Sequence, residues 1–207
     1  MTLMQDFPSV PPALTDIIAC ADVSNSNEGI SFTLQQLLQL ASPVAYIPIT
    51  MEVPQGTVAY PDIHNLATAG TKVSGFVLPD GASASFVNYK VVVPNGLAAI
   101  PGASILVIYQ TLAAVAGTPT VHMTLSRRFF GDGFDLDIAP IAETPIDENV
   151  PTTTETRGSV EFSLSADPAV ENLIMGQIGR DPTNVNDDFT GDIQIIAMYL
   201  KITRQSA

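Results

Sequence analysis

The segment that most constrains the fold is the C-terminal stretch 193–203, which has the pattern of a long strand. Alternate residues of a strand point to opposite faces of its sheet. One face would carry Ile193, Ile195, Ala197 and Tyr199, and the other Ile196, Met198, Leu200 and Ile202. Both faces are therefore predicted to be apolar. We expect a second sheet to cover one of them, and a partner chain or the preceding arm to cover the other.

Short apolar runs separated by turn residues fill the chain from Pro43 onward. Proline, glycine and asparagine between the runs are typical of turns. Many short strands at near-regular spacing predict an all-β fold, an antiparallel β-sandwich of the jelly-roll type. A proline-rich stretch, 139–158, is expected to be irregular. Strands are expected near residues 44–53, 72–78, 84–93, 103–112, 119–127, 134–138, 158–164, 173–180 and 192–203.

Two parts are predicted, an N-terminal arm over residues 1–42 and the sandwich over residues 43–207. Three prolines within the first 13 residues oppose helix formation and favour an extended arm. Residues 14–23 follow with a short strand pattern. The arm is expected to serve attachment or oligomerisation.

A short helix is expected over residues 33–41, because Thr33 and Gln36 have the spacing of a capping box. A helix of this length is marginal alone and needs a surface on which to dock. Its apolar face is therefore a candidate interface. That face carries Leu34, Leu37 and Leu38.

Composition limits the classes of function. Charged residues form 14% of the chain, whereas soluble domains average roughly 25%. Few charges remain to cover the surface, which favours buried subunit contacts. The formal net charge is −13, and the only adjacent pair of cations is Arg127–Arg128. Since nucleic-acid binding needs clustered cations, no nucleic-acid partner is expected.

The sequence gives no sign of export or membrane insertion. Cys20 is the only cysteine, which rules out an intrachain disulfide, and a small buried hydrophobe is its expected role. The first residues have neither a basic region nor a long apolar run, so no signal peptide is expected. No apolar run approaches the roughly 20 residues that span a bilayer, and no membrane partner is expected.

Motifs of known enzyme classes are absent from the sequence. The two histidines, His64 and His122, lie near no nucleophile motif, and there is no P-loop or dinucleotide-binding fingerprint. One cysteine and two histidines are a poor supply of zinc ligands. A glycosidase would need paired carboxylates and aromatic platforms, but tryptophan is absent. We expect neither a cofactor nor enzyme activity.

Two acidic clusters remain as candidate sites. Asp135 and Asp137 would share one face of the expected strand 134–138. The Asp/Asn-rich segment 181–192 offers oxygen ligands of the kind calcium takes, although Phe189 stands where an EF-hand needs glycine. The alternative, favoured because such turns are common, is a loop whose side chains cap their own backbone. The calcium candidates are Asp181, Asn184, Asn186 and Asp188.

Two segments resemble parts of phage structural proteins. Residues 14–40, with Leu-Thr-Asp-Ile-Ile and then Gly-Ile-Ser-Phe-Thr-Leu-Gln-Gln-Leu-Leu, resemble a short attachment module near the N-termini of tailed-bacteriophage structural proteins. The remainder, ending in Asn186-Asp-Asp-Phe-Thr-Gly-Asp-Ile-Gln-Ile-Ile-Ala-Met-Tyr-Leu-Lys201, resembles the jelly-roll virion proteins of phages that infect aquatic bacteria. The resemblance implies a β-sandwich, a homotrimer and no enzyme activity.

The first functional hypothesis is a homotrimeric capsid decoration or cement protein that stabilises the head shell. Its partners would be copies of itself and the phage major capsid protein or other virion proteins. Its location would be the virion, assembled in the host cytoplasm. Trimerisation would cover the second apolar face of the last strand. Candidate interface residues are Leu34, Leu37, Leu38, Ile196, Met198, Leu200 and Ile202.

Two alternatives stand beside this hypothesis. Within the virion, the chain would be a tail fibre or tail-tip adaptor protein whose sandwich binds host glycan or another fibre. From a different class, it would be a carbohydrate-binding module or a glycan-degrading enzyme. Glycan binding or turnover would favour that class.

Overall fold

The computed structural model describes residues 17–21, 29–33, 44–52, 58–67, 70–94, 102–169 and 172–203. The chain divides into two compact units, Met1–Pro43 with Ser206–Ala207, and Val44–Gln205. Strands are the only regular elements in the described part, and none of its residues forms a helix long and apolar enough to cross a membrane.

The N-terminal unit contains one antiparallel hairpin, β1 (Ile17–Ala21) with β2 (Gly29–Thr33). The first strand falls within the predicted stretch 14–23. Thr33, expected to cap a helix, is the last residue of β2 and pairs with Ile17. The rest of the predicted helix, with Leu34, Leu37 and Leu38, lies outside the described residues.

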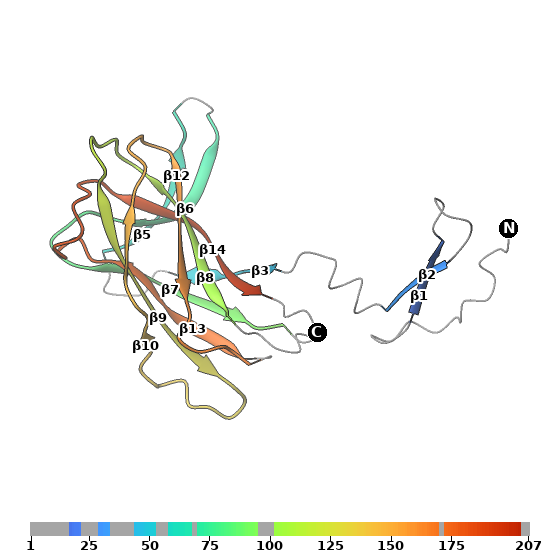
Figure 1. The fold of residues 1–207 in the computed structure, drawn as a ribbon. Coiled ribbons are helices and arrows are strands. Elements are labelled where there is room, and N and C mark those ends of the chain that lie inside the picture. Colours follow the sequence, from blue (N-terminus) through green and yellow to red (C-terminus); the bar gives the residue numbers. More distant parts are fainter. Residues whose placement is uncertain are drawn as a thin grey trace. The chain divides into compact units, whose positions relative to one another are not determined.

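The second unit is a sandwich of two antiparallel sheets, which confirms the predicted all-β class (Figure 1). The first, called the β14 sheet, has β14 at its centre. Its strands in order are β12 (Arg157–Ser163), β8 (Ser104–Thr111), β14 (Ile193–Thr203), β6 (Lys72–Leu78) and β5 (Tyr60–Asn65), and β3 (Val44–Pro48) also pairs with β14.

The second sheet, called the β13 sheet, lies opposite the first. All its neighbouring strands are antiparallel. Its strands in order are β10 (Ile141–Ala142), β9 (Thr120–Phe130), β13 (Leu173–Arg180), β7 (Ser85–Val92) and β4 (Thr50–Glu52), and β11 (Ile146–Asn149) also pairs with β9.

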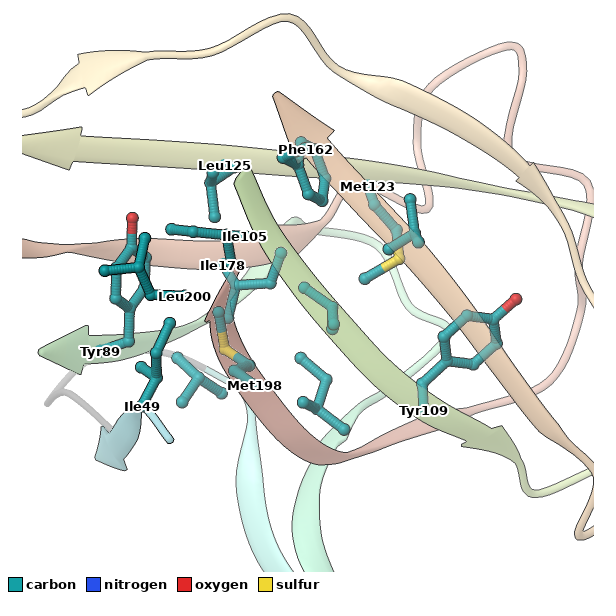
Figure 2. Packing of buried hydrophobic residues seen from close by; sticks show 14 of the residues in the cluster. Ile49, Tyr89, Ile105, Tyr109, Met123, Leu125, Phe162, Ile178, Met198 and Leu200 are labelled. Carbon is teal, nitrogen blue, oxygen red and sulfur yellow. The ribbon is translucent and has the colours of Figure 1, made fainter. Parts of the chain in front are cut away.

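The core fills the space between the sheets. Ile105 of β8, Met123 and Leu125 of β9, Ile178 of β13 and Leu200 of β14 point into it together (Figure 2). Each of them is at most 1% exposed. Buried and half-buried residues alternate along β9, so one face of this strand packs on the core and the other is partly exposed.

The last strand does not have two apolar faces, and that prediction is wrong. A β-bulge lies between Ile195 and Ala197, where the pairing with β8 shifts. A bulge places two residues opposite one, so the alternation of faces changes at that point. Residues on both sides of the bulge therefore face the same core. They are Ile193, Ile195, Met198, Leu200 and Ile202, all at most 1% exposed.

The bulge also corrects the expected interface. Met198, Leu200 and Ile202 belong to the core of their own chain and offer no surface to a partner. Ile196 is half-buried at the bulge itself and lines a groove with Phe76 and Ile63.

The outer side of β14 has a mixed character. Gln194 is buried there and accepts a hydrogen bond from Gln110 Nε2 at 2.6 Å. Farther along, Lys201 Nζ contacts Glu161 Oε2 at 2.8 Å.

Three other strand predictions need correction. The expected strand 44–53 is two strands in different sheets, β3 and β4, which part at the buried Ile49. No strand covers 134–138, because residues 131–140 form a loop that turns at Gly133, where φ is 78°. The stretch 139–158, expected to be irregular, contributes β10 and β11.

The strand β5 was not predicted, because its sequence contains Pro61 and alternates weakly.

Gly176 in β13 provides a test of this packing. A Cβ atom at that position would lie 1.9 Å from the Ser126 carbonyl oxygen and 2.8 Å from Tyr89 Oη. We expect Gly176→Ala to lower the free energy of unfolding by about 1–3 kcal/mol, because backbone and core would have to shift. Urea denaturation measures this change.

Gly81→Ala is the matched control, since nothing lies within 4 Å of a Cβ atom there. Equal stability of the two variants would contradict the close approach of β13 and β9.

Candidate functional site

A cleft of about 250 Å³ lies on the outer face of the β13 sheet. The core-facing residues of β7 are Val87, Tyr89 and Val91, so Asn88 and Lys90 point to the opposite side. Strands β4, β7, β13 and β9 form the floor of this cleft, and the loop of residues 131–140 forms one wall.

The register of three strands brings the floor residues together. Gln177 of β13 lies opposite Asn88 of β7 on one side and Ser126 of β9 on the other. Two residues earlier, Met175 lies opposite Lys90 and Arg128. Directly opposed side chains on one face lie about 4.5–5.5 Å apart. The floor therefore has two rows. The amide row contains Asn88 and Gln177, and the second row has Met175 between the cations Lys90 and Arg128.

The amide row is already ordered by a hydrogen bond. Gln177 Nε2 donates to Asn88 Oδ1 at 3.1 Å. Each carboxamide has two N–H donors and one carbonyl acceptor. The N–H groups of Asn88 and the carbonyl oxygen of Gln177 have no partner among the described residues. The pair can therefore offer a ligand both a donor and an acceptor in fixed positions.

The two cations of the second row differ in their partners. Lys90 Nζ contacts Glu52 Oε1 at 2.5 Å, at the β4 edge of the sheet. Arg128 is half-buried, and within the described part of the chain no carboxylate lies within 4 Å of it. One end of the row is thus neutralised, and the other end is a cation facing the cleft.

The wall beside this polar floor is apolar. Leu136, Ile138 and Pro140 line the cleft from the loop, and Phe130 and Met175 continue the apolar surface. Leu136 is 61% exposed and Phe134 of the same loop is 59% exposed, so exposed apolar side chains gather on this loop. A pocket with apolar walls and a few placed polar groups is typical of sites for small polar ligands.

Below the floor, Tyr89 supports β9. Its Oη donates to the Ser126 carbonyl oxygen at 3.0 Å, past Gly176, which has no side chain to block the contact. Burial raises the pKa of Tyr89, while Arg127 acts in the opposite direction. The phenol therefore remains protonated and keeps its role as a donor.

The loop of residues 131–140 also places the first acidic cluster. Asp135 and Asp137 do not share a strand face, because they lie in this loop, where Asp135 Oδ1 accepts a hydrogen bond from the Asp137 backbone N–H at 2.9 Å. Both side chains are exposed. This local turn holds the loop in the shape that forms the wall.

Three of the four calcium candidates bind backbone groups, whereas Asn186 Nδ2 donates to Asp147 Oδ2 at 2.8 Å. Asp181 Oδ1 accepts from Thr183 N at 3.1 Å, and Asn184 Oδ1 accepts from Asn186 N at 3.0 Å. Asp188 Oδ1 accepts from Thr120 N at 2.6 Å. These contacts match the backbone-capping alternative for the calcium candidates. In the described ranges, no three His, Cys, Asp or Glu residues form a group that could hold a metal ion.

Arg180 organises this acidic loop, a role that sequence analysis missed. Its side chain is fully buried, and its Nε and Nη2 atoms donate to the two carboxylate oxygens of Asp187 at 2.9 and 2.7 Å. It also donates to the carbonyl oxygens of Phe189 and Gly191. The sequence signal is an arginine at a strand end followed at once by an acidic loop.

The two histidines lie away from the cleft. His122 lies on the wet face of β9, where Nδ1 is 2.6 Å from Asp147 Oδ1. His64 lies in β5, with Nε2 3.1 Å from Glu155 Oε1. Hydrogen bonds from the Ala67 backbone and from His64 lower the pKa of Glu155. His122 thus links β9 to its neighbour β11, and His64 links β5 to the loop that precedes β12.

No protein-family model matches this sequence, and no curated protein matches it. Solved structures do match. An isomalto-dextranase of Arthrobacter globiformis T6 aligns with 76% of this chain at 18% identity and a TM-score of 0.47. The xylan-binding domain CBM22-1 of Paenibacillus barcinonensis Xyn10C aligns with 77% at 14% identity and a TM-score of 0.40.

A third match is the enzymatically active domain of tailspike protein 4 of bacteriophage CBA120, at 13% identity over 77% of this chain with a TM-score of 0.36. The alignments cover 23% of the isomalto-dextranase, 88% of the xylan-binding domain and 19% of the tailspike chain. The sandwich is similar in fold to carbohydrate-binding modules and to part of a phage tailspike. At these identities the likeness concerns architecture alone.

The Arg180–Asp187 pair generates a prediction about stability. Arg180→Gln leaves the carboxylate of Asp187 buried without its partner, and we expect the free energy of unfolding to fall by about 3–5 kcal/mol. The double variant Arg180→Met/Asp187→Leu removes both charges and should recover part of this loss. Chemical denaturation of both variants measures the difference.

Arg157→Gln is the control, because Arg157 is exposed and has no ion pair among the described residues. A cost for Arg180→Gln no larger than that of the control would show that the buried pair does not hold the loop.

Proposed function

We propose that this chain is a non-catalytic glycan-binding β-sandwich, and that the cleft on the β13 sheet holds one sugar unit of a longer polysaccharide. The observation that carries the proposal is the preordered amide pair, Asn88 and Gln177, beside an apolar wall. A sugar ring has hydroxyl groups on its edge and C–H groups on its faces. The amides suit the hydroxyl groups, and the wall suits the ring face.

The size of the cleft supports binding of one unit within a chain. Pockets that enclose a whole drug-sized ligand begin at roughly 300 Å³. The cleft has about 250 Å³, and it is open at the surface of the sheet. A polymer can therefore place one unit in it while the neighbouring units continue into solvent.

The acidic residues of the cleft argue for binding without hydrolysis. Most glycosidases need two carboxyl groups beside the scissile bond. Glu52 is the only carboxylate among the described residues that line the cleft, and it pairs with Lys90. The proposed role is therefore retention of the glycan.

This role favours the tail-appendage hypothesis over the capsid-cement hypothesis. The cement hypothesis expected an apolar interface on β14, whereas the bulge at Ile196 leaves Met198, Leu200 and Ile202 facing the core of their own chain. A glycan-binding sandwich joined to an attachment module suits a tail fibre or tail-tip adaptor that meets the host surface. Residues 14–40, which resemble such a module, fall in the separate unit Met1–Pro43.

Several copies on one particle would strengthen such binding. A cleft for one sugar unit offers few contacts, so its affinity is expected to be modest. A homotrimer would raise the effective concentration of the remaining clefts once one is occupied. The trimer is part of this proposal, with the virion as its location.

The amide pair provides the direct test of glycan binding. Asn88→Ala and Gln177→Ala each remove one partner of the pair, and we expect each to weaken binding about tenfold, since a lost hydrogen bond of about 1.4 kcal/mol has that effect. A glycan array made from surface polysaccharides of aquatic bacteria identifies a ligand. Titration calorimetry then compares the variants.

The matched control is Asn65→Ala, an exposed amide on the β14 sheet. Binding that Asn65→Ala weakens as much as Asn88→Ala would place the ligand elsewhere. Absence of binding by the unaltered chain across the array would overturn the proposed function.

A further inference from the structure

We propose that the cleft selects an acidic sugar, with the guanidinium of Arg128 binding the carboxylate of a uronic-acid unit. This inference rests on the glycan-binding function proposed above and names the class of sugar. It follows from the distribution of charge in and around the cleft.

Arg128 differs from four other cations of the two sheets, which have carboxylate partners, and it is half-buried, whereas Lys72 and Arg157 are exposed. Arg127, Arg180, Lys90 and Lys201 each contact a carboxylate of this chain. Arg128 lines the cleft without such a contact among the described residues, although the chain has 21 acidic residues against 8 basic ones. In so acidic a chain, a half-buried guanidinium that has no carboxylate partner in the part of the chain that the structure describes is suited to receive one from a ligand.

The neighbouring residue cannot take this role. Arg127 faces the other side of β9 and is 3% exposed. Its Nε donates to Glu143 Oε1 at 2.5 Å, and its Nη2 donates to Ser165 Oγ at 2.8 Å. Of the adjacent pair noted in the sequence, one arginine is structural and the other faces the cleft.

The charges also orient the ligand. At the β4 edge, Lys90 is already paired with Glu52, so this end of the row offers no unpaired cation to a second carboxylate. The acidic group of a sugar is therefore directed to the β9 side, where Arg128 lies. An arginine can bind a carboxylate through two parallel N–H groups, which fixes the direction as well as the distance.

The amide row then takes the rest of the same sugar unit. Residues two apart in a strand are about 7 Å apart, because a strand rises about 3.3–3.4 Å per residue. Arg128 and Met175 occupy one row, and Gln177 and Asn88 the next. One pyranose unit can span these rows, with its carboxylate on Arg128 and its ring hydroxyl groups on the amides.

The charge of the whole chain adds a restriction on the polymer. A net charge of −13 opposes the approach of a polyanion, although screening limits this effect beyond about 8 Å at physiological salt. A polysaccharide in which acidic units alternate with neutral ones meets less repulsion than a polyuronate. The ligand class is therefore a heteropolysaccharide with isolated carboxylated units.

The test compares each acidic ligand with its own neutral form. The probes are hyaluronan and glucuronoxylan oligosaccharides, each also prepared with the uronate carboxyl reduced to a primary alcohol. Titration calorimetry on the full chain in 0.15 M NaCl gives the ratio of the two affinities for each probe. We expect at least one acidic form to bind about tenfold more tightly than its reduced form, the scale of one charge-assisted contact.

Two variants test whether Arg128 causes the difference in affinity between the acidic and the reduced form. Arg128→Gln should bring the ratio close to one, and Arg128→Lys should give an intermediate value because the paired N–H geometry is lost. Arg157→Gln, on the β14 sheet, should leave the ratio as it is. Matching urea midpoints of the variants show that the fold is intact.

The outcomes separate the two proposals. Equal affinity for the acidic and reduced forms, with binding still sensitive to Gln177→Ala, overturns the acidic preference and leaves the glycan-binding function standing. A preference that persists in Arg128→Gln also overturns the inference. No binding of either form, together with an array that finds no ligand, overturns both.

Discussion

The buried guanidinium of Arg180 is the contact on which the arrangement of the two sheets most depends. It stands at the end of β13, the middle strand of one sheet, and binds Asp187 and two carbonyl groups of the loop that leads to β14 in the other. The His122 backbone N–H also donates to Asp187. This charged pair thus ties the end of β13 to β9 and to the loop that leads into β14.

The strand pattern was the most predictable part of the fold. Turn residues and alternation located β6, β7, β8, β9, β12, β13 and β14 to within a few residues. Two errors had local causes. An apolar run in the sequence does not show where a bulge changes which residues face the core. The bulge at Ile196 therefore made one buried face look like two. Ile49 looked like the middle of a strand, although the chain changes sheets there.

The site was much harder to predict, because it depends on register rather than on any local motif. Asn88, Arg128 and Gln177 are separated by 40 or more positions in the sequence, and each is ordinary where it stands. The sequence did draw attention to Arg127–Arg128, but it could not show that the two side chains lie on opposite faces of β9. Clustered carboxylates were the candidates for a metal site, but in the loop 181–192 they bind backbone N–H groups.

The wall of the cleft is one continuous stretch, residues 131–140, between two paired strands. It is shaped by its own turns and contributes little to the core between the sheets. The length and composition of this loop can change without disturbing the two sheets. Chains related to this one would be free to diversify in this stretch while Gly176 and its neighbours stayed the same, so differences in the shape of the cleft are expected to concentrate in ten residues.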